Sequence, residues 1–295
     1  MIAAAGGNAE IVKNKPDGLF CTAKRSLAAI MCRLSLIHIY VDLIAAEDTR
    51  NSIRLLNHFD IHTPMTSYHE YNRVEKGHEL IRLLQEGKNV ALITDAGTPA
   101  ISDPGEVLVK MCQEAGITVT SLPGPAACIT ALTLSGLSTR RFCFEGFLPF
   151  DNKKELRAVL EELKEETRTI ILYEAPHHLI RTLKSLEEAL GDRRVTLCRE
   201  LTKKFETVFP TTLREALAFY ETREPRGEYV LVIEGRSRRE KEQEQQAAFA
   251  EMSMEEHMDL YENQGLDRKE AMKRVAKDRG ISRREVYQYF LERRG

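Results

Sequence analysis

Short apolar runs alternate with longer amphipathic runs from Val41 to Glu234, and this alternation constrains the fold more than any other feature. Short apolar runs are typical of buried strands, and amphipathic runs of helices. Strands that alternate with helices predict a mostly parallel sheet with helices on both faces, so we predict an α/β fold. The expected strands are residues 41–46, 90–94, 117–122, 142–144, 169–173, 195–198 and 229–234, and the expected helices are residues 49–59, 79–86, 106–115, 126–135, 153–166, 179–190 and 213–221.

The most informative motif is the loop at residues 95–105, which follows one apolar run and precedes a helical run. Its sequence, DAGTPAISDPG, combines carboxylates, hydroxyls, glycines and prolines. Glycine lets the backbone approach a ligand, and proline stiffens a loop so that less order is lost on binding. An ordinary strand-to-helix connection is the alternative, but such connections are usually shorter. Because open α/β sheets hold ligands at the carboxyl ends of their strands, the loop predicts a binding site.

Further polar clusters follow other expected strands. They are residues 47–50, 67–70, 173–176 and 199–204. Each cluster alone is compatible with a helix cap or a surface turn. Together they would line one edge of each sheet, where a substrate would lie. The residues alone therefore predict a two-domain α/β ligand-binding enzyme with a polar cleft.

Composition and missing motifs exclude several classes. No apolar run approaches the roughly 20 residues that span a bilayer, so we expect no membrane association. The six cysteines are scattered without a CxxC pair, which argues against a zinc site and a disulfide framework and favours the cytoplasm. The sequence contains no GxxxxGK[ST], GxGxxG, HExxH or GxSxG motif, so the corresponding phosphate, dinucleotide, zinc and serine-nucleophile sites are not predicted.

The C-terminal end is basic and helical. Residues 265–295 hold ten Lys or Arg and five Asp or Glu, whereas the whole chain has a net charge of −2. Capping patterns begin at Ser253, Asp267 and Ser282, and Gly280 is a predicted helix C-cap. A basic helical module of this kind suits contact with nucleic-acid phosphates, although a dimerisation or packing tail is equally compatible with the pattern.

These features divide the chain into five parts. The stiff segment SLPGP at residues 121–125 predicts a domain boundary, and the polar, aliphatic-poor run after residue 235 is interpreted as a linker. The predicted parts are an atypical N-terminal segment (1–40), an N-terminal α/β domain (41–121), a C-terminal α/β domain (122–235), a charged linker (236–250) and a helical tail (251–295).

Seven runs carry a resemblance to a known family. They are AAEDTR (45–50), SYHEYN (67–72), LITDAGTPAISDPG (92–105), LPGPAA (122–127), YEAPHH (173–178), RELTKKFE (199–206) and RGEYVLVIEG (226–235). In this order and spacing, residues 41–235 resemble the tetrapyrrole methylase superfamily, the class III S-adenosylmethionine methyltransferases. Within it, the match is to the branch that methylates ribosomal RNA.

The resemblance implies two α/β domains with S-adenosylmethionine in a cleft between them, and a homodimer. It implies methyl transfer to a ribose 2′-hydroxyl of a cytidine in the decoding region of 16S rRNA. By position, it also implies two cofactor-contacting segments. Their residues are Asp95, Ala96, Gly97, Thr98, Pro99, Ser102 and Asp103 in the loop, and Gly124, Ala126 and Ala127 in a second turn.

A ribose 2′-hydroxyl is a poor acid, so a nearby base or a cation that favours the alkoxide would assist transfer. Glu47, Asp48 and His69 are the candidate bases. Arg50 and Lys203 are candidates for holding phosphate or stabilising the alkoxide. The basic tail would add phosphate contacts with the RNA.

The sequence departs from the family pattern before residue 41. Family members open with an apolar strand that leads into a TPIGN-type loop, and residues 1–40 show no such segment, a pattern that an altered reading frame would produce. We therefore expect a sheet without its first, central strand and with part of its cofactor wall missing. Smaller departures are Tyr71 and His178, where the family more often has His and Arg.

Two alternative functions remain. One is methylation of a small tetrapyrrole, against which the basic tail and the AEDTR run argue. The other is a non-catalytic RNA-binding protein whose cofactor site is broken at residues 1–40.

Overall fold

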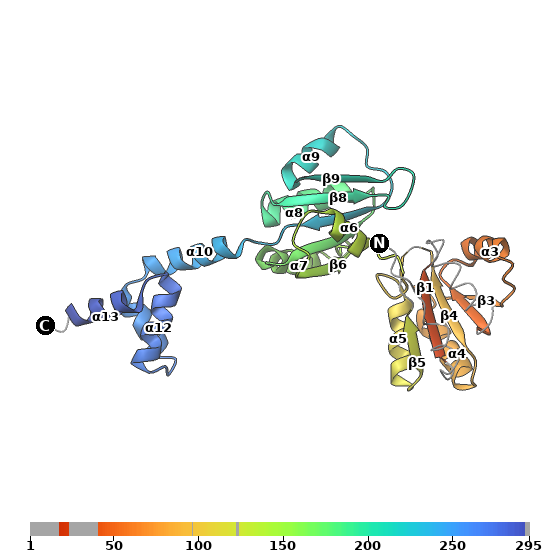
Figure 1. Cartoon of the computed structure of the whole chain (residues 1–295), viewed down its shortest axis with the longest axis horizontal. Coiled ribbons are helices and arrows are strands. Elements are labelled where there is room, and N and C mark those ends of the chain that lie inside the picture. The colour runs from red at the N-terminus through yellow and green to blue at the C-terminus, as the bar shows by residue number, and fades with distance from the viewer. Residues whose placement is uncertain (1–17, 24–40, 96, 122–123, 293–295) are drawn as a thin grey trace, which may run out of the picture. The chain divides into compact units, whose positions relative to one another are not determined.

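The computed structural model describes residues 18–23, 41–95, 97–121 and 124–292 (Figure 1). The chain divides into two compact units. The first unit is Met1–Leu134 with Cys198–Thr207, and the second is Ser135–Leu197 with Val208–Gly295. The boundary predicted at residues 121–125 lies before helix α6 (Ala127–Leu134), whereas this division falls directly after it.

The first unit contains a five-stranded sheet in the order β3-β2-β4-β1-β5, and its four neighbouring pairs are all parallel, as predicted. Most of the expected elements form within a few residues of their predicted bounds. The strands are β1 (Gly18–Ala23), β2 (Leu43–Ala46), β3 (Met65–Ser67), β4 (Val90–Thr94) and β5 (Thr118–Ser121), and the helices before α6 in the described residues are α3 (Thr49–His58), α4 (Arg73–Gln85) and α5 (Gly105–Glu114).

Strand β1 overturns the expectation of a missing central strand. Leu19 pairs in register with Val90 of β4 on one side and with Val119 of β5 on the other. The sequence of β1, GLFCTA, is a short run with apolar and β-branched residues, which favours a strand even without the family's usual motif. Its neighbour β4 is buried along its whole length, so a strand on each side is needed to satisfy its backbone groups.

Helices cover both faces of the first sheet, because successive residues of a strand point to opposite sides. On one face, Leu92 belongs to a buried cluster with Leu80 of α4 and Leu108 of α5. On the other face, Ile93 belongs to a separate buried cluster with Leu56 of α3. The predicted doubly covered sheet is confirmed, and its carboxyl edge is left for the loops.

The second unit contains a sheet in the order β6-β7-β10-β8-β9. Strand β6 runs parallel to β7, but β10 runs antiparallel to it, so this sheet is mixed. The strands are β6 (Phe142–Gly146), β7 (Thr169–Glu174), β8 (Arg194–Arg199), β9 (Thr207–Thr212) and β10 (Tyr229–Ile233), and the helices are α7 (Lys153–Glu165), α8 (Leu179–Leu190) and α9 (Leu213–Glu221).

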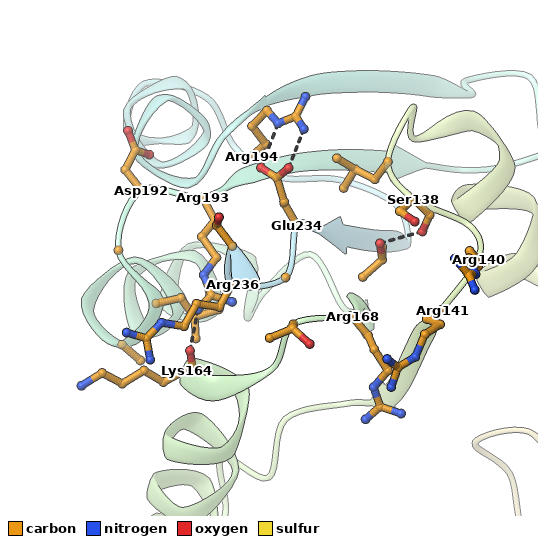
Figure 2. Close-up of a pocket in the computed structure, with 18 of the residues that line it drawn as sticks. Ser138, Arg140, Arg141, Lys164, Arg168, Asp192, Arg193, Arg194, Glu234 and Arg236 are labelled. Atoms are coloured by element: carbon orange, nitrogen blue, oxygen red, sulfur yellow. Dashed lines mark hydrogen bonds and ion pairs between the residues drawn. The ribbon is translucent and has the colours of Figure 1, made fainter. Parts of the chain in front are cut away.

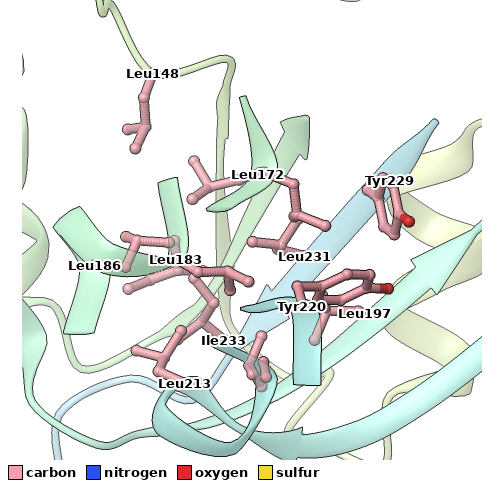
Figure 3. Packing of buried hydrophobic residues seen from close by; sticks show 14 of the residues in the cluster. Leu148, Leu172, Leu183, Leu186, Leu197, Leu213, Tyr220, Tyr229, Leu231 and Ile233 are labelled. Atoms are coloured by element: carbon pink, nitrogen blue, oxygen red, sulfur yellow. The ribbon is translucent and has the colours of Figure 1, made fainter. Parts of the chain in front are cut away.

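The core of the second unit joins its sheet to these three helices (Figure 3). Leu172 of β7 and Leu231 of β10 are fully buried, together with Leu183 of α8 and Leu213 of α9. Burying a leucine side chain contributes about 1.5–3 kcal/mol. This core holds β7 and β10 in place and thereby fixes the loops at both ends of the sheet.

The C-terminal helices are α10 (Arg238–Glu251), α11 (Met254–Glu262), α12 (Arg268–Arg279) and α13 (Arg283–Glu292). Ser253 and Asp267 cap α11 and α12 as predicted, and Gly280 ends α12 at a φ of 64°. Ser282 and Glu285 bond reciprocally at the start of α13. Buried side chains of α11, α12 and α13 form a small core of Met258, Ala271, Val275, Ala276 and Val286.

The segment interpreted as a charged linker is mostly helical. Helix α10 occupies residues 238–251, within and just beyond the predicted linker at 236–250. Its sequence is rich in Glu, Gln, Arg and Ala, which favour helices even when few apolar residues are present. Low hydrophobicity is therefore a poor signal for an irregular segment here.

Among the described residues, no helix is long and apolar enough to cross a membrane. This part of the chain also brings together no group of three or more His, Cys, Asp or Glu residues that could hold a metal ion. Four of the six cysteines have described side chains, and these are free thiols, namely Cys112, Cys128, Cys143 and Cys198.

Candidate active site

The loop between β4 and α5 is held by the carboxylate of Asp103. Its two oxygens accept hydrogen bonds from the backbone N–H of Ala100, at 2.9 Å each, and one of them accepts from Gly105 at 2.7 Å. Burial raises the pKa of Asp103 above its ordinary value, although these N–H groups act in the opposite direction. The Asp103 carboxylate therefore fixes the course of the loop.

The same loop turns through left-handed backbone at residues other than glycine. Ala100 has a φ of 67° and Ser102 a φ of 57°, and Gly97 between β4 and these residues has a φ of 78°. Left-handed conformations at non-glycine residues cost of order 1–3 kcal/mol and persist where the surroundings fix them, often around ligands. Close packing adds to the constraint, because a Cβ at Gly105 would lie 2.7 Å from both Asp103 Oδ1 and Leu92 Cδ2.

The two segments predicted to contact the cofactor lie together in the first unit. Thr98 Oγ1 donates a hydrogen bond to the carbonyl oxygen of Pro125 at 3.0 Å. A Cβ at Gly97 would lie 3.9 Å from the same oxygen. Gly124 and Ala126 flank Pro125, and Ala127 follows as the first residue of α6. Ala96 lies outside the described residues.

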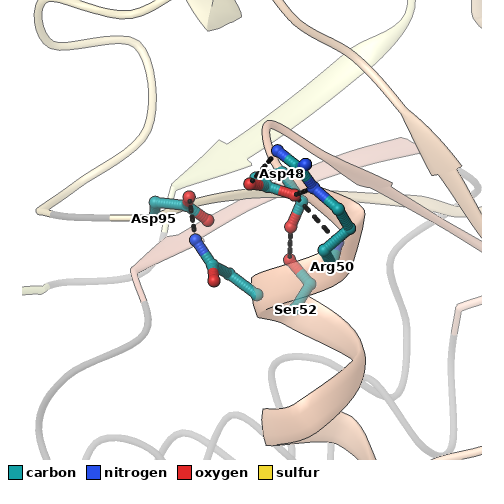
Figure 4. Close-up of polar contacts among 5 residues, drawn as sticks. Asp48, Arg50, Ser52 and Asp95 are labelled. Carbon is teal, nitrogen blue, oxygen red and sulfur yellow. Dashed lines mark hydrogen bonds and ion pairs between the residues drawn. The ribbon is translucent and has the colours of Figure 1, made fainter.

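The ends of β2 and β4 are joined by Glu47. Its carboxylate accepts a hydrogen bond from Thr94 Oγ1 at 2.6 Å and one from the backbone N–H of Asp95 at 3.3 Å. Asp95 in turn accepts a hydrogen bond from Asn51 Nδ2 at 3.0 Å (Figure 4). The candidate base Glu47 is thus part of a network that positions Asp95.

Asp48 is the N-cap of α3, and Figure 4 shows its carboxylate facing Arg50. It accepts from the backbone N–H of Arg50 at 2.9 Å and from its guanidinium at 3.1 Å. Hydrogen bonds from the Arg50 side chain and backbone hold the pKa of Asp48 below its ordinary value. The Arg50 side chain is nevertheless 89% exposed, so it can contact a further anion.

His69 follows the short strand β3. Its backbone N–H donates to Asn72 Oδ1 at 2.8 Å, and its ring meets Tyr71 edge-on at a centroid distance of 6.1 Å. Its Nδ1 is buried and has no hydrogen-bond partner among the described residues. A buried imidazole nitrogen without a partner is unusual, and it is open to a hydrogen bond from a ligand.

Strands β3, β2 and β4 are consecutive in the sheet and run parallel, so their carboxyl ends share one edge. His69, Glu47 and Asp95 each follow one of these strands. The structure therefore places three of the predicted site residues along one edge of the first sheet.

Lys203 lies in the loop after β8, within the segment that groups with the first unit. Its Nζ donates to Glu200 Oε1 at 2.9 Å. Glu200 and Thr202 have positive φ values of 50° and 65°, so this loop is also constrained.

Two residues support the site without a role predicted from the sequence: Asn51, which was not singled out, and Tyr68, which was only part of the polar cluster at residues 67–70. Asn51 contacts Asp95, and its position directly after the AEDTR run was an available signal. Tyr68 lies under the loop, where its hydroxyl donates to the Pro104 carbonyl oxygen at 3.1 Å. Burial raises the pKa of Tyr68 to about 12, so the hydroxyl stays protonated as a donor.

Comparison with known proteins shows the family of the chain. The sequence pattern of the tetrapyrrole (corrin/porphyrin) methylases matches residues 40–217. The chain is 46% identical over 253 residues to ribosomal RNA small subunit methyltransferase I of Synechocystis sp.. The aligned region covers 85% of this chain and 88% of that protein. It is 45% identical over 247 residues to the protein of the same name from Bacillus subtilis, and 84% of each chain is covered.

Solved structures support the fold. The methyltransferase CobJ has a TM-score of 0.54 at 17% identity, and the match covers 74% of this chain and 94% of that one. Diphthine synthase has a TM-score of 0.53 at 12% identity, with 73% and 89% covered. The chain therefore belongs to the tetrapyrrole methylase family, and within it to the ribosomal RNA small subunit methyltransferases I.

Proposed function

We propose that this methyltransferase transfers a methyl group from S-adenosylmethionine to the 2′-hydroxyl of a cytidine ribose in the decoding region of 16S rRNA. The observation that carries the proposal is the constrained loop at residues 95–105, tied by Thr98 to the Pro125 turn and flanked by the polar ends of β2 and β3. The names of the relatives support ribosomal RNA as the substrate class.

The loop suits the proposed cofactor. S-adenosylmethionine presents an ammonium group, a carboxylate and ribose hydroxyls, so its site needs acceptors, donors and close backbone approach. Asp95 offers a carboxylate, Ser102 a hydroxyl, and Gly97 a backbone conformation that favours glycine. We propose that the cofactor is held by the predicted set, Asp95, Ala96, Gly97, Thr98, Pro99, Ser102, Asp103, Gly124, Ala126 and Ala127. Within this set, Asp103 and Thr98 act by shaping the site.

The sulfonium of the bound cofactor supplies a methyl group that is already activated. What remains for the protein is to place the ribose oxygen in line and to accept its proton. The buried Nδ1 of His69 has no hydrogen-bond partner among the described residues and can accept that proton from a ribose that reaches it, whereas the carboxylate of Asp48 is held by Arg50 with a lowered pKa. We therefore favour His69 as the general base and assign Glu47 to positioning Asp95.

Arg50, Lys203 and the basic C-terminal helices are the cations proposed to hold the RNA. The exposed guanidinium of Arg50 is placed to contact a phosphate, and Lys203 is proposed to do the same or to stabilise the alkoxide. The basic C-terminal helices would add phosphate contacts. The homodimer implied by the family resemblance and the cytoplasmic location predicted from the cysteine pattern belong to this proposal.

The experiment is transfer of a labelled methyl group from S-adenosylmethionine to small ribosomal subunits that lack the modification, followed by mapping of the label. The proposal expects label on a ribose 2′-oxygen of 16S rRNA. Label on a base, or on a small tetrapyrrole offered in the same assay, would contradict it.

His69→Gln tests the assignment of the base, with His78→Gln on the exposed face of α4 as the matched control. A missing general base typically lowers the rate 10²–10⁴-fold. We expect that loss in kcat for His69→Gln, with cofactor affinity retained in both variants. An unchanged kcat would remove His69 from the mechanism without affecting the identity of the product.

A further inference from the structure

A pocket of about 1130 Å³ lies in the second unit, away from the residues discussed so far (Figure 2). It is lined by the segments that precede β6 and β7, by the start of β8 and by the residues that follow β10. Strand β10 runs antiparallel to β7, so its carboxyl end meets the amino end of β7. The pocket therefore lies at the edge of the sheet that holds the amino end of β7. The YEAPHH run begins at the carboxyl end of β7, at the opposite edge.

The lining is strongly basic. Seven lining residues are Arg or Lys and three are Asp or Glu. The cations are Arg140, Arg141, Lys164, Arg168, Arg193, Arg194 and Arg236, and the carboxylates are Glu188, Asp192 and Glu234. Apolar side chains are few, so the pocket differs from the mostly apolar sites that bind small organic ligands.

Four of these cations are fixed by protein partners. Arg194 forms a bidentate ion pair with Glu234, with N···O distances of 2.9 and 2.5 Å. Arg168 forms an ion pair with Glu166 at 2.5 Å. Arg236 pairs with Glu165. Arg193 instead donates to the carbonyl oxygens of Leu163 and Lys164 at the end of α7. These contacts organise the pocket wall.

The other three cations are available to a ligand. Arg140, Arg141 and Lys164 are exposed, and their side chains form no hydrogen bond or ion pair within the described part of the chain. Figure 2 shows Arg140 and Arg141 on one side of the pocket, with Arg168, and Lys164 on the other, with Arg193 and Arg236. Two separate groups of cations suit a ligand with several anionic groups better than a single phosphate ion.

The backbone of Gly235, which lines the pocket, packs closely against the segment before β7. A Cβ at this position would lie 2.2 Å from the carbonyl oxygen of Arg168. Any other residue would force this segment outward. The shape of the basic pocket thus depends on a glycine at this position.

We propose that this pocket binds the phosphodiester backbone of RNA. The inference rests on the proposed function, which supplies an RNA substrate. Strand β7 has six residues and therefore separates the two sheet edges by roughly 17–20 Å. RNA held in the pocket would therefore be bound at the opposite end of β7 from the YEAPHH run.

The test neutralises the three available cations in the full chain, as Arg140→Gln, Arg141→Gln and Lys164→Gln together. The control is Lys153→Gln, Lys154→Gln and Arg157→Gln, three exposed cations of α7 outside the pocket. Binding to a 16S rRNA transcript is measured over a series of salt concentrations. Loss of three phosphate contacts should reduce the steepness of the plot of log binding constant against log salt concentration by roughly 2–3. It should also lower the affinity about 10- to 30-fold.

The expected result is this loss in the pocket variant, with little change in the control and unchanged binding of S-adenosylmethionine in both. Equal slopes for the pocket variant and the wild type would overturn the inference. So would weaker binding to whole subunits with unchanged binding to the transcript, since this would indicate a ribosomal protein as the partner. A wild type that binds the transcript but transfers no methyl group would contradict the proposed function and leave this test intact.

Discussion

Replacing Asp103 with alanine tests the claim that one carboxylate holds the loop at residues 95–105. The change removes the acceptor for the N–H groups of Ala100 and Gly105, which are bonded at 2.9 and 2.7 Å. A buried donor left without a partner costs about 1–3 kcal/mol, so two such donors cost about 2–6 kcal/mol. The left-handed backbone at Ala100 and Ser102 would then relax, because its main constraint is gone.

Hydrogen exchange of the Ala100 and Gly105 amides is the most direct assay. Since 1.4 kcal/mol corresponds to a factor of ten, we expect exchange at these amides to accelerate by about 30-fold or more. Binding of S-adenosylmethionine should weaken in parallel, while the second unit keeps its protection. Unchanged exchange at both amides in Asp103→Ala would refute the reasoning.

Asp103→Asn separates the effect of charge from that of hydrogen bonding. The folded-state pKa of Asp103 is raised by burial, so its ionisation opposes folding. Asp103 therefore contributes most to the free energy of unfolding below its ordinary pKa of 3.8, and this contribution falls as the pH rises through the raised pKa of the folded state. The asparagine variant should lack this pH dependence and lose less loop protection than the alanine variant, because one acceptor oxygen remains.

Three further predictions follow from the site and its surroundings. Asp48→Ala removes the N-cap of α3 and should lower stability by about 1 kcal/mol in urea unfolding, whereas Asp48→Asn should restore most of it. Tyr68→Phe removes the hydroxyl that donates to Pro104, and should cost about 0.5–1.5 kcal/mol in the same assay and accelerate exchange in the loop. The Arg168 side chain, with the Arg168 backbone N–H, lowers the pKa of Glu166 to about 2, so this contact stabilises the fold above pH 4.5 and is lost as the pH falls through 2. Glu166→Gln should therefore be less stable than the wild type at pH 7, and the difference should shrink strongly by pH 2, which thermal unfolding at the two pH values would measure.

The sequence predicted the elements with strong local signals. Helix α8 and helix α9 have the predicted bounds, because an apolar stripe and clear ends mark each one. The caps at Ser253 and Asp267 were predicted for the same reason, since the capping side chain and its target lie three residues apart.

The missed elements had weak or misleading signals. Strands β3 and β9 lie at sheet edges, where burial is low and alternation is unclear. Strand β9 also contains Pro210, which cannot donate to a sheet ladder and is tolerated at an edge. The antiparallel direction of β10 depends on a chain path that local patterning does not record.

The candidate site shows the same limit. The positions of Asp95, Glu47 and His69 after parallel strands predicted a common edge. Asp103 accepts hydrogen bonds from the backbone, whereas the Nδ1 of His69 has no partner among the described residues. This difference depends on the geometry of the loops. Residue type and spacing alone could not assign them different roles.

The place of β1 in the sheet has a consequence for synthesis of the chain. Residues 18–23 are made early, but their neighbours in β4 and β5 end at residues 94 and 121. At the usual 5–20 residues per second, roughly 5–20 s separate the synthesis of β1 from that of its last partner. During this interval a chaperone that binds extended apolar segments would find β1 accessible, and the first unit can complete its sheet only after β5 has left the ribosome.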